Sequence, residues 1–479
     1  MHSLGTDGEA LRDGPIWDPG NPVVEQKSHE VAPSRADFRE VTQTVKDRQK
    51  HSHKTRADQG SLADGPKANK IAATTLYDFG GKSLTPYGGL FPVATMLEKL
   101  EFQRLVEETL TVKRIPRVMT VYQFVLAMVL AIYVGFSRLN HLRFVAHDPM
   151  LTGLLKVASL PGQSVFWRFM ASLHLSVARQ LLKLQQVLRE RAWAAANVRL
   201  LAITLDTDTT VHTLYGNQMG ARKGYNPKNK GKKSYQPILT FIAETREYLW
   251  GELRNGDRPD GKQIARHLAD VFAALPGCVV RLLARADAGF YCWEAVQAYE
   301  KAKAGFILVA RKTSRLLDQL QAAAWKPSPQ TDADEQCEFW YRPEGWGKAY
   351  RFLALRYKKN DQTPREQYQL LDAPQYLYRV FVTNMDDNIA LLVWFYNQRA
   401  GAENLIKEAN NDAGLAAHPS RRWATNCVHF QLVMLAYNLN CPWRALGPAK
   451  PHENRSESTH NPEWLGAARS NQQWRGRDR

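Results

Sequence analysis

Residues 200–210 read LLAITLDTDTT, an apolar run that leads into Asp206 and Asp208. Side chains alternate across a β-strand, so a strand here would place both carboxylates on one face. An apolar strand that delivers acids to its end is a rigid way to present metal ligands. For this stretch alone, an ordinary strand-to-turn transition with Asp as the turn former is the alternative.

A second apolar stretch, VVRLLARADAGFY at 279–291, delivers Asp287 in the same way. The ends of neighbouring strands lie about 5 Å apart, so we expect Asp208 and Asp287 to bind one divalent cation between them. Carboxylate oxygens suit Mg²⁺ or Mn²⁺, and phosphoryl transfer commonly uses two such ions about 3.5 to 4 Å apart. Together the two strands predict a metal site for phosphoryl transfer.

The third candidate acid is Glu403, in the stretch VWFYNQRAGAENLIKEANND at 393–412. At 3.6 residues per turn, Tyr396, Arg399, Glu403, Lys407 and Asn410 would share one face of a helix. That face would present a carboxylate between two basic side chains. A surface helix with i, i+4 salt bridges is the alternative for this stretch taken alone.

A basic loop supplies the expected substrate contacts. Residues 209–243 contain no acid, and ARKGYNPKNKGKKSY at 221–235 interleaves cations with Tyr225 and Tyr235. The basic residues are Arg222, Lys223, Lys228, Lys230, Lys232 and Lys233. This pattern suits phosphate contacts and base stacking, with a merely solvated loop as the alternative. His212, near the first acid, is as well explained by a structural role as by a ligand role.

The order of expected elements favours an α/β fold with an RNase H-like catalytic core. We expect strands at 198–205, 211–215 and 235–243, a helix at 261–275, a strand at 279–286, a helix at 293–303 and a strand at 306–310. This is the order of an RNase H-like domain. We assign that domain to 198–311 and 381–442, with a β-rich insertion subdomain at 312–380. A helical N-terminal lobe at 71–197 precedes it, and we expect a disordered leader at 1–70 and a disordered tail at 443–479.

Composition narrows the class of partner. The chain has 479 residues and a net charge of +17, which favours a polyanion, either nucleic acid or a membrane surface. Its five cysteines form no CxxC pair and suggest a reducing cytoplasm. The apolar stretch at 118–136 approaches the length of a membrane span, but Thr120, Gln123 and two tyrosines favour a buried helix and no membrane partner.

The blocks at 205–239, 285–291 and 395–408 together resemble the DDE transposases of bacterial insertion sequences, in the group with a Tyr-x2-Arg-x3-Glu-x6-Lys signature. The resemblance runs from LTPYGGL at 84–90 to AYNL at 436–439. It implies that Asp208, Asp287 and Glu403 are the catalytic, metal-binding acids, with Asp206 as the alternative to Asp208. It further implies that Tyr396 and Arg399 engage the DNA end, while the helical lobe recognises terminal inverted repeats.

The same resemblance implies double-stranded DNA partners, both transposon ends and target, a homodimer in a synaptic complex, two Mg²⁺ or Mn²⁺ ions and a place near the bacterial nucleoid. One departure is visible: the signature Lys falls at position 410, where this chain has Asn410. Lys407, one turn from Glu403, is the expected substitute for the phosphate contact. Two rival functions stay open, namely an RNase H-like nuclease or resolvase, and a catalytically impaired DNA-binding remnant.

Overall fold

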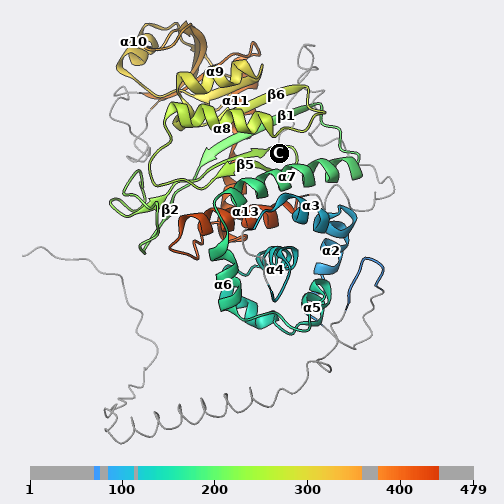
Figure 1. The fold of residues 1–479 in the computed structure, drawn as a ribbon. Coiled ribbons are helices and arrows are strands. Elements are labelled where there is room, and N and C mark those ends of the chain that lie inside the picture. Colours follow the sequence, from blue (N-terminus) through green and yellow to red (C-terminus); the bar gives the residue numbers. More distant parts are fainter. Residues whose placement is uncertain (1–69, 76–84, 113–116, 359–375, 442–479) are drawn as a thin grey trace, which may run out of the picture. The chain divides into compact units, whose positions relative to one another are not determined.

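The computed structural model describes residues 70–75, 85–112, 117–358 and 376–441. The expected tail at 443–479 lies outside these residues, as does the expected leader apart from residue 70. The described strands form a mixed nine-stranded sheet in the order β5-β4-β1-β6-β7-β11-β10-β9-β8 (Figure 1). They are β1 (Ala202–Thr209), β4 (Ile238–Ile242), β5 (Tyr248–Glu252), β6 (Arg281–Ala286), β7 (Gly305–Val309), β8 (Lys326–Pro327), β9 (Glu335–Tyr341), β10 (Tyr350–Lys358) and β11 (Tyr376–Thr383).

The strand directions bring two candidate acids to one edge. β1, β4 and β5 form an antiparallel meander, whereas β6 and β7 run parallel to β1. The parallel strands need crossovers, which α8 (Gly261–Ala273) and α9 (Trp293–Lys301) supply on one face of the sheet. Parallel neighbours end at the same edge, so the carboxyl ends of β1 and β6 lie side by side.

The meander differs in detail from the sequence expectation. The stretch expected as the second strand is only β2 (His212–Thr213), and it pairs with β3 (Ser234–Tyr235) in a separate two-stranded ribbon. The third strand of the meander is β5, which the sequence analysis missed. A tight turn with Arg246 at φ 61° joins β4 to β5, and no Gly, Asn or Pro marks it.

The strands after β7 extend the same sheet. α10 (Ser314–Ala322) follows β7, and β8 to β10 then form a meander whose last member pairs with β11. β11 in turn pairs antiparallel with β7. The β-rich material expected as an inserted subdomain is therefore continuous with the sheet that carries the candidate acids, and it joins that sheet through β7.

Helices account for most of the described chain before β1 and after β11. They are α2 (Leu90–Lys99), α3 (Phe102–Thr109), α4 (Val121–Tyr133), α5 (Pro149–Leu155), α6 (Gln163–Ser172), α7 (Ser176–Ala195), α11 (Ile389–Asn397), α12 (Ala400–Asn411) and α13 (Trp423–Asn438), with 3-10 turns at Leu139–Val145 and Ala288–Phe290. The long apolar stretch forms α4, capped by a Thr120–Gln123 capping box and buried along Phe124–Ile132, which confirms the buried helix. Within the described ranges, none of the helices has the length and apolar character needed to cross a membrane.

Helix α13 lies at the centre of the helical core. Its residues 425–437 are all buried, and it packs on α4, α6, α7 and β5 (Figure 1). A helix that is apolar on every side must be enclosed by other elements. α13 therefore links the helices before β1 to the sheet.

The two faces of β1 have different neighbours. Thr207 faces α8, because its hydroxyl lies 2.9 Å from that of Thr240, which is itself 2.8 Å from Nε2 of His267 on α8. Asp206 and Asp208 take the opposite face by alternation, and there α12 packs on β1. The expected common face for the two carboxylates is thus present, although β1 continues through both residues to Thr209.

Candidate active site

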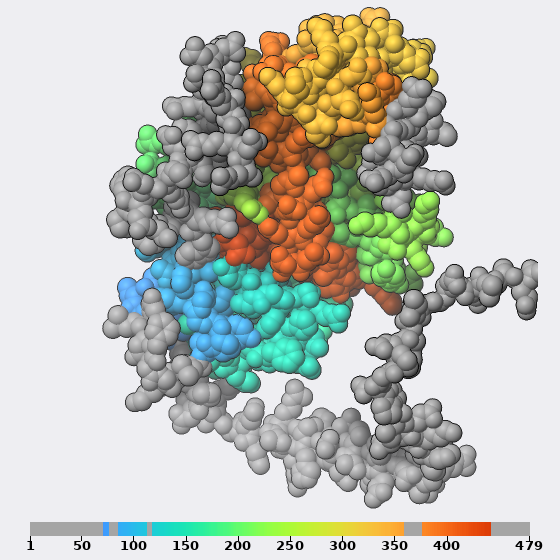
Figure 2. Space-filling model, turned by 180° about the vertical axis from the view of Figure 1, so that it is seen from behind, coloured from blue at the N-terminus to red at the C-terminus, as the bar shows by residue number. Residues whose placement is uncertain are grey.

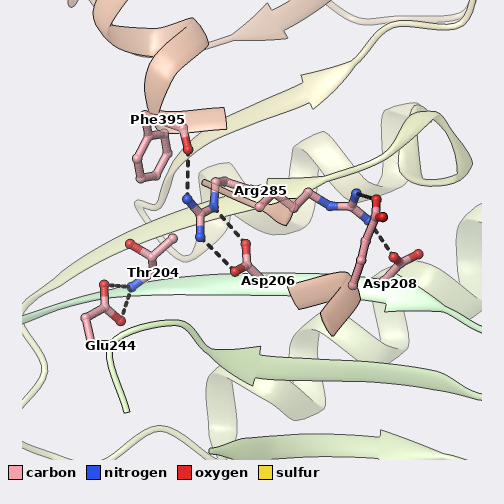
Figure 3. Close-up of polar contacts among 8 residues, drawn as sticks. Thr204, Asp206, Asp208, Glu244, Arg285 and Phe395 are labelled. Atoms are coloured by element: carbon pink, nitrogen blue, oxygen red, sulfur yellow. Dashed lines mark hydrogen bonds and ion pairs between the residues drawn. The ribbon is translucent and has the colours of Figure 1, made fainter. Parts of the chain in front are cut away.

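Asp206 is fully engaged by a neighbouring strand. Arg285 on β6 donates from Nε and a terminal nitrogen to the two carboxylate oxygens of Asp206, both at 2.7 Å (Figure 3). Its other terminal nitrogen donates to the carbonyl of Phe395 at 2.7 Å. The side chains are 4% and 2% exposed, so this is a buried bidentate ion pair with little access for a ligand.

Asp208 lies two residues further along the same face and is more accessible, with 16% of its side chain exposed. The backbone N–H of Thr209 donates to one of its oxygens at 2.7 Å, and Arg399 forms an ion pair with the other at 2.7 Å. The pKa of Asp208 is raised to about 6, chiefly by burial; Asp287 and Glu403 also raise it, and Arg399 lowers it. The three candidate acids therefore interact electrostatically.

Asp287 directly follows β6 and is half-buried. The last β1–β6 register pair is Thr207 with Ala286, so one step further the chain places Asp208 beside Asp287. Asp287 also begins a 3-10 turn, because its carboxylate accepts from the N–H of Gly289 at 2.9 Å. Neighbouring strand ends thus present these two carboxylates together, as expected from two apolar strands that each end in an Asp.

Arg399 connects the third acid to the first. It lies between α11 and α12, and its guanidinium is 2.7 Å from Asp208 and 3.5 Å from Glu403, which is 55% exposed. Burial acts to lower the pKa of Arg399, but Asp208, Tyr396 and Asp287 outweigh it and hold the pKa above its ordinary value. Arg399 is therefore a permanent cation that holds Asp208 and Glu403 on the same side of the sheet.

The expected single helical face is divided. α11 ends at Asn397 and α12 begins at Ala400, so Tyr396 and Glu403 belong to different helices. Tyr396 is 6% exposed, and its ring packs 4.8 Å from that of Phe381. Neither Tyr396 nor Arg399 presents its side chain to solvent, whereas Lys407 is exposed.

The carboxylates suit a divalent cation in donor type. The pKa of Asp208 is raised to about 6, first by burial and then by the negative charges of Asp287 and Glu403. A divalent cation would relieve that repulsion. Among the described residues, however, no three His, Cys, Asp or Glu side chains are grouped closely enough to form a complete metal site. Glu403 would have to approach the two aspartates.

Asn410, at the position of the signature Lys, is part of a buried polar network. Its amide oxygen accepts from Nε2 of His212 at 2.9 Å, and its amide nitrogen lies 3.3 Å from the hydroxyl of Thr210. Nδ1 of His212 then accepts from Nε2 of His418 at 3.0 Å. Burial lowers the pKa of His212 to about 4, so the ring is neutral. Asn410 thereby ties α12 to the segment that leaves β1, and His212 has a structural role here.

The expected basic loop is anchored at its base and charged at its tip. The amide of Asn226 is buried and donates to Thr213 at 3.0 Å. A Cβ on Gly224 would lie 1.9 Å from the carbonyl oxygen of Gly256, so this packing requires a glycine. Arg222 pairs with Asp257 at 2.7 Å. The lysines are exposed without an acidic partner within the described chain; they are Lys223, Lys228, Lys230, Lys232 and Lys233.

The two tyrosines of the loop differ. Tyr225 is 45% exposed, with the guanidinium of Arg258 3.6 Å from its ring centre. Tyr235 is fully buried against His418 and Trp423, and its hydroxyl donates to the carbonyl of Met219 at 2.5 Å. Only Tyr225 of this pair offers a ring to a base.

Arg285 is the main site residue that the sequence analysis missed. A signal was present, since an arginine in the middle of an otherwise apolar strand needs a buried partner. Its position two residues before Asp287 places it on the face of β6 that Asp206 meets on β1. Reading the two strands in register would have identified the pair.

Comparison with known proteins places the chain in a family. The family described as "Transposase DDE domain group 1" matches residues 69–459. No curated protein matches the sequence. Among solved structures, the cryo-EM structure of a piggyBac transposase synaptic complex with hairpin DNA is similar at 11% identity and a TM-score of 0.42, over 74% of this chain and 72% of that one.

Proposed function

Because the chain belongs to the family of transposase DDE domains, group 1, we propose that it is an insertion-sequence transposase that binds terminal inverted repeats and catalyses metal-dependent strand cleavage and strand transfer. Its catalytic acids are Asp208, Asp287 and Glu403, and its catalytic domain is RNase H-like. The observation that carries the proposal is the register of parallel β1 and β6, whose last pair, Thr207 with Ala286, is followed on the two strands by Asp208 and Asp287.

The strand arrangement supports the RNase H-like assignment. An antiparallel meander, β1-β4-β5, is followed by two strands parallel to β1 on its other side, with one helix before each of them. The acids lie where the first and fourth of these five strands end. β8 to β11 then lengthen the sheet between the second and third acids, as the proposed β-rich insertion would.

Asp206 is assigned a supporting role. Its two oxygens are already held by Arg285, and this pair joins β1 to β6 two register steps before Asp208 and Asp287. Asp208, whose side chain is 16% exposed against 2% for Asp206, is the ligand of the two. The same argument makes Arg399 a positioning residue, because it contacts Asp208 and Glu403 from a buried position.

The proposed cofactor is a pair of Mg²⁺ or Mn²⁺ ions, which would activate the attacking water or hydroxyl and neutralise charge on the scissile phosphate. The chain's own contribution is to bring three carboxylates together on rigid elements. Lys407 and the lysines of the basic loop supply positive charge for the flanking phosphates. Arg222, Lys223 and Tyr225 extend that contact.

Double-stranded DNA, both element ends and target, is the proposed partner, bound by a homodimer in a synaptic complex. The helices at 90–195 are the proposed binding elements for the terminal repeats. A bacterial cytoplasm, at the nucleoid, is the proposed location. These parts of the proposal rest on the sequence resemblance and on the chain's net charge of +17.

The test is a cleavage and strand-transfer assay on DNA that carries the element's own ends, with Mg²⁺. Asp208→Asn, Asp287→Asn and Glu403→Gln should each abolish cleavage and retain DNA binding. Asp318→Asn, at an exposed acid on α10, is the matched control and should cleave normally.

If any of the three acid variants cleaves DNA at the wild-type rate, the catalytic assignment is refuted. Cleavage without joining would identify a nuclease or resolvase. Binding without cleavage in Mg²⁺ or Mn²⁺ would identify a DNA-binding remnant.

A further inference from the structure

Three segments of the chain contain no acidic residue, although Asp and Glu make up 47 of its 479 residues. They are residues 149–189, 209–243 and 413–441. The first lies before the candidate active site in sequence, the second contains the basic loop and the third contains α13. Nothing in their sequence separation requires them to be neighbours.

The fold brings these three segments together. Arg422 donates to the carbonyl of Ala171 at the end of α6, at 3.0 Å. The N–H of Met219 donates to the carbonyl of Arg421 at 2.9 Å. Gly220 packs so closely on Trp423 that an added Cβ would lie 2.6 Å from its ring. These contacts join the exposed parts of the three segments into one surface, here called the acid-free surface, which runs from α6 across the start of α13 to the basic loop. Asp257, which lies outside the three segments, pairs with Arg222 of that loop.

This acid-free surface carries both cations and exposed aromatic rings. Its cations include Arg168, Arg421 and Arg422, beside the lysines of the basic loop. Its exposed rings are Trp167, Tyr215 and Tyr225, which are 45%, 84% and 45% exposed. On the face seen in Figure 2, the blue-green helices before β1, the orange-red segment after β11 and the bright green loop adjoin one another.

Trp167 lies at the junction of two acid-free segments. The guanidinium of Arg422 is 5.9 Å from its ring centre, and the ring still has 45% of its surface exposed. A large apolar ring left in solvent beside a cation is a common platform for an unpaired base, because every base has a stacking face and a phosphate nearby. Base-paired DNA does not offer such faces along its length.

From this arrangement we infer that the acid-free surface is a track for a DNA segment with unpaired bases, which stack on Trp167 and Tyr215 while phosphates contact Arg168 and Arg421. The inference rests on the proposed transposase function and adds a substrate feature to it. β1 leads from Asp208 into this surface through His212, so the track extends the candidate active site toward α6.

The experiment compares equilibrium binding of the full chain to two DNAs of equal length, a blunt duplex and a duplex with one splayed, unpaired end. Trp167→Ala and Tyr215→Ala should each weaken binding to the splayed DNA about tenfold, in line with the loss of one stacked base, and leave blunt-duplex binding within about twofold. Trp340→Ala, which removes a 70% exposed ring on β9, is the matched control and should change neither.

A second pair of variants tests the phosphate contacts. Arg168→Ala with Arg421→Ala should weaken binding to both DNAs and reduce the slope of log affinity against log salt by about one for each lost phosphate contact. Lys99→Ala, at an exposed lysine on α2, should leave that slope unchanged.

The inference is overturned if wild type binds the two DNAs equally, or if Trp167→Ala and Tyr215→Ala lower both affinities alike. It is also overturned if the arginine variants keep the wild-type salt slope. In each case, cleavage by wild type that depends on Asp208 would leave the proposed function standing. If wild type binds neither DNA, both this inference and the proposed function are refuted.

Discussion

Asp206→Asn and Asp208→Asn should have opposite consequences, although the two residues lie on one face of one strand. Asp206 is 2% exposed and accepts two hydrogen bonds from Arg285, whose remaining acceptor among the described residues is the carbonyl of Phe395. Replacing Asp206 leaves a buried guanidinium without its counter-charge. The loss of one partner from such a pair costs about 3 to 5 kcal/mol.

For Asp208→Asn, two effects oppose each other. The change removes a carboxylate whose pKa is raised to about 6 by burial and by Asp287 and Glu403, which relieves repulsion at neutral pH. It also removes one partner of Arg399, but Glu403 remains 3.5 Å from that guanidinium. We expect a net change in the free energy of unfolding within about 1 kcal/mol, together with complete loss of cleavage.

Urea unfolding at pH 7, followed by circular dichroism, measures the two free energies, and equal m values would show that the folded and unfolded states are comparable. Cleavage is assayed in parallel on the same preparations. The reasoning is refuted if Asp206→Asn is as stable as wild type, or if Asp208→Asn is destabilised as strongly as Asp206→Asn. If Asp208→Asn cleaves DNA while Asp206→Asn is stable but inactive, Asp206 is the catalytic acid and Asp208 has the supporting role.

Three further outcomes follow from the same structure. Burial lowers the pKa of His267 to about 3 and that of His429 to about 4, whereas in the unfolded chain both histidines bind protons below about pH 6.5. The free energy of unfolding should therefore be constant above pH 6.5 and fall as the pH drops toward 4, by about 2 kcal/mol per histidine at pH 5. A urea midpoint that does not change between pH 6.5 and pH 4 would contradict this. Asn410→Lys removes the hydrogen-bond acceptor of the buried His212 and should lower the free energy of unfolding by about 1 to 3 kcal/mol. Unchanged stability together with faster cleavage would show instead that a cation at position 410 binds DNA. Gly224→Ala should displace the basic loop, because the new Cβ would clash with the backbone carbonyl of Gly256. DNA binding in a filter or fluorescence assay should therefore weaken, and a variant that binds as tightly as wild type would show that the loop accommodates the added methyl group.

The sequence predicted the two strand-end aspartates because that prediction depends only on local pattern. An apolar run followed by Asp, with side chains alternating across the strand, places Asp208 and Asp287 without knowledge of distant contacts. The register that sets them beside each other follows from the parallel pairing of β1 and β6. Likewise, the long apolar stretch at 118–136 could be assigned to a buried helix from the polar residues within it, Thr120, Gln123 and two tyrosines.

Features that depend on tertiary context could not be predicted in this way. The break between α11 and α12 falls at Gln398 and Arg399, and neither is a Pro or Gly that would mark it in the sequence. The helical spacing of the site residues continues through the break. The burial of Tyr396 depends on Phe381 from another strand. The role of Asn410 depends on His212, nearly two hundred residues earlier in the chain, with which it shares a hydrogen bond. Such partners are chosen by packing and have no local sequence signal.

Helix α13 has a consequence for how the chain is made. The helices at 90–195 emerge from the ribosome first, yet the helix that fills the space between α4, α6, α7 and β5 is among the last described residues to be synthesised. Until residues 423–438 appear, the apolar surfaces that will enclose them have no partner, so the nascent chain must hold an unfinished core through most of its translation. Any product that stops before Trp423 would keep the basic loop and all three candidate acids but lack the helix that joins them to the N-terminal helices, and would be prone to aggregate.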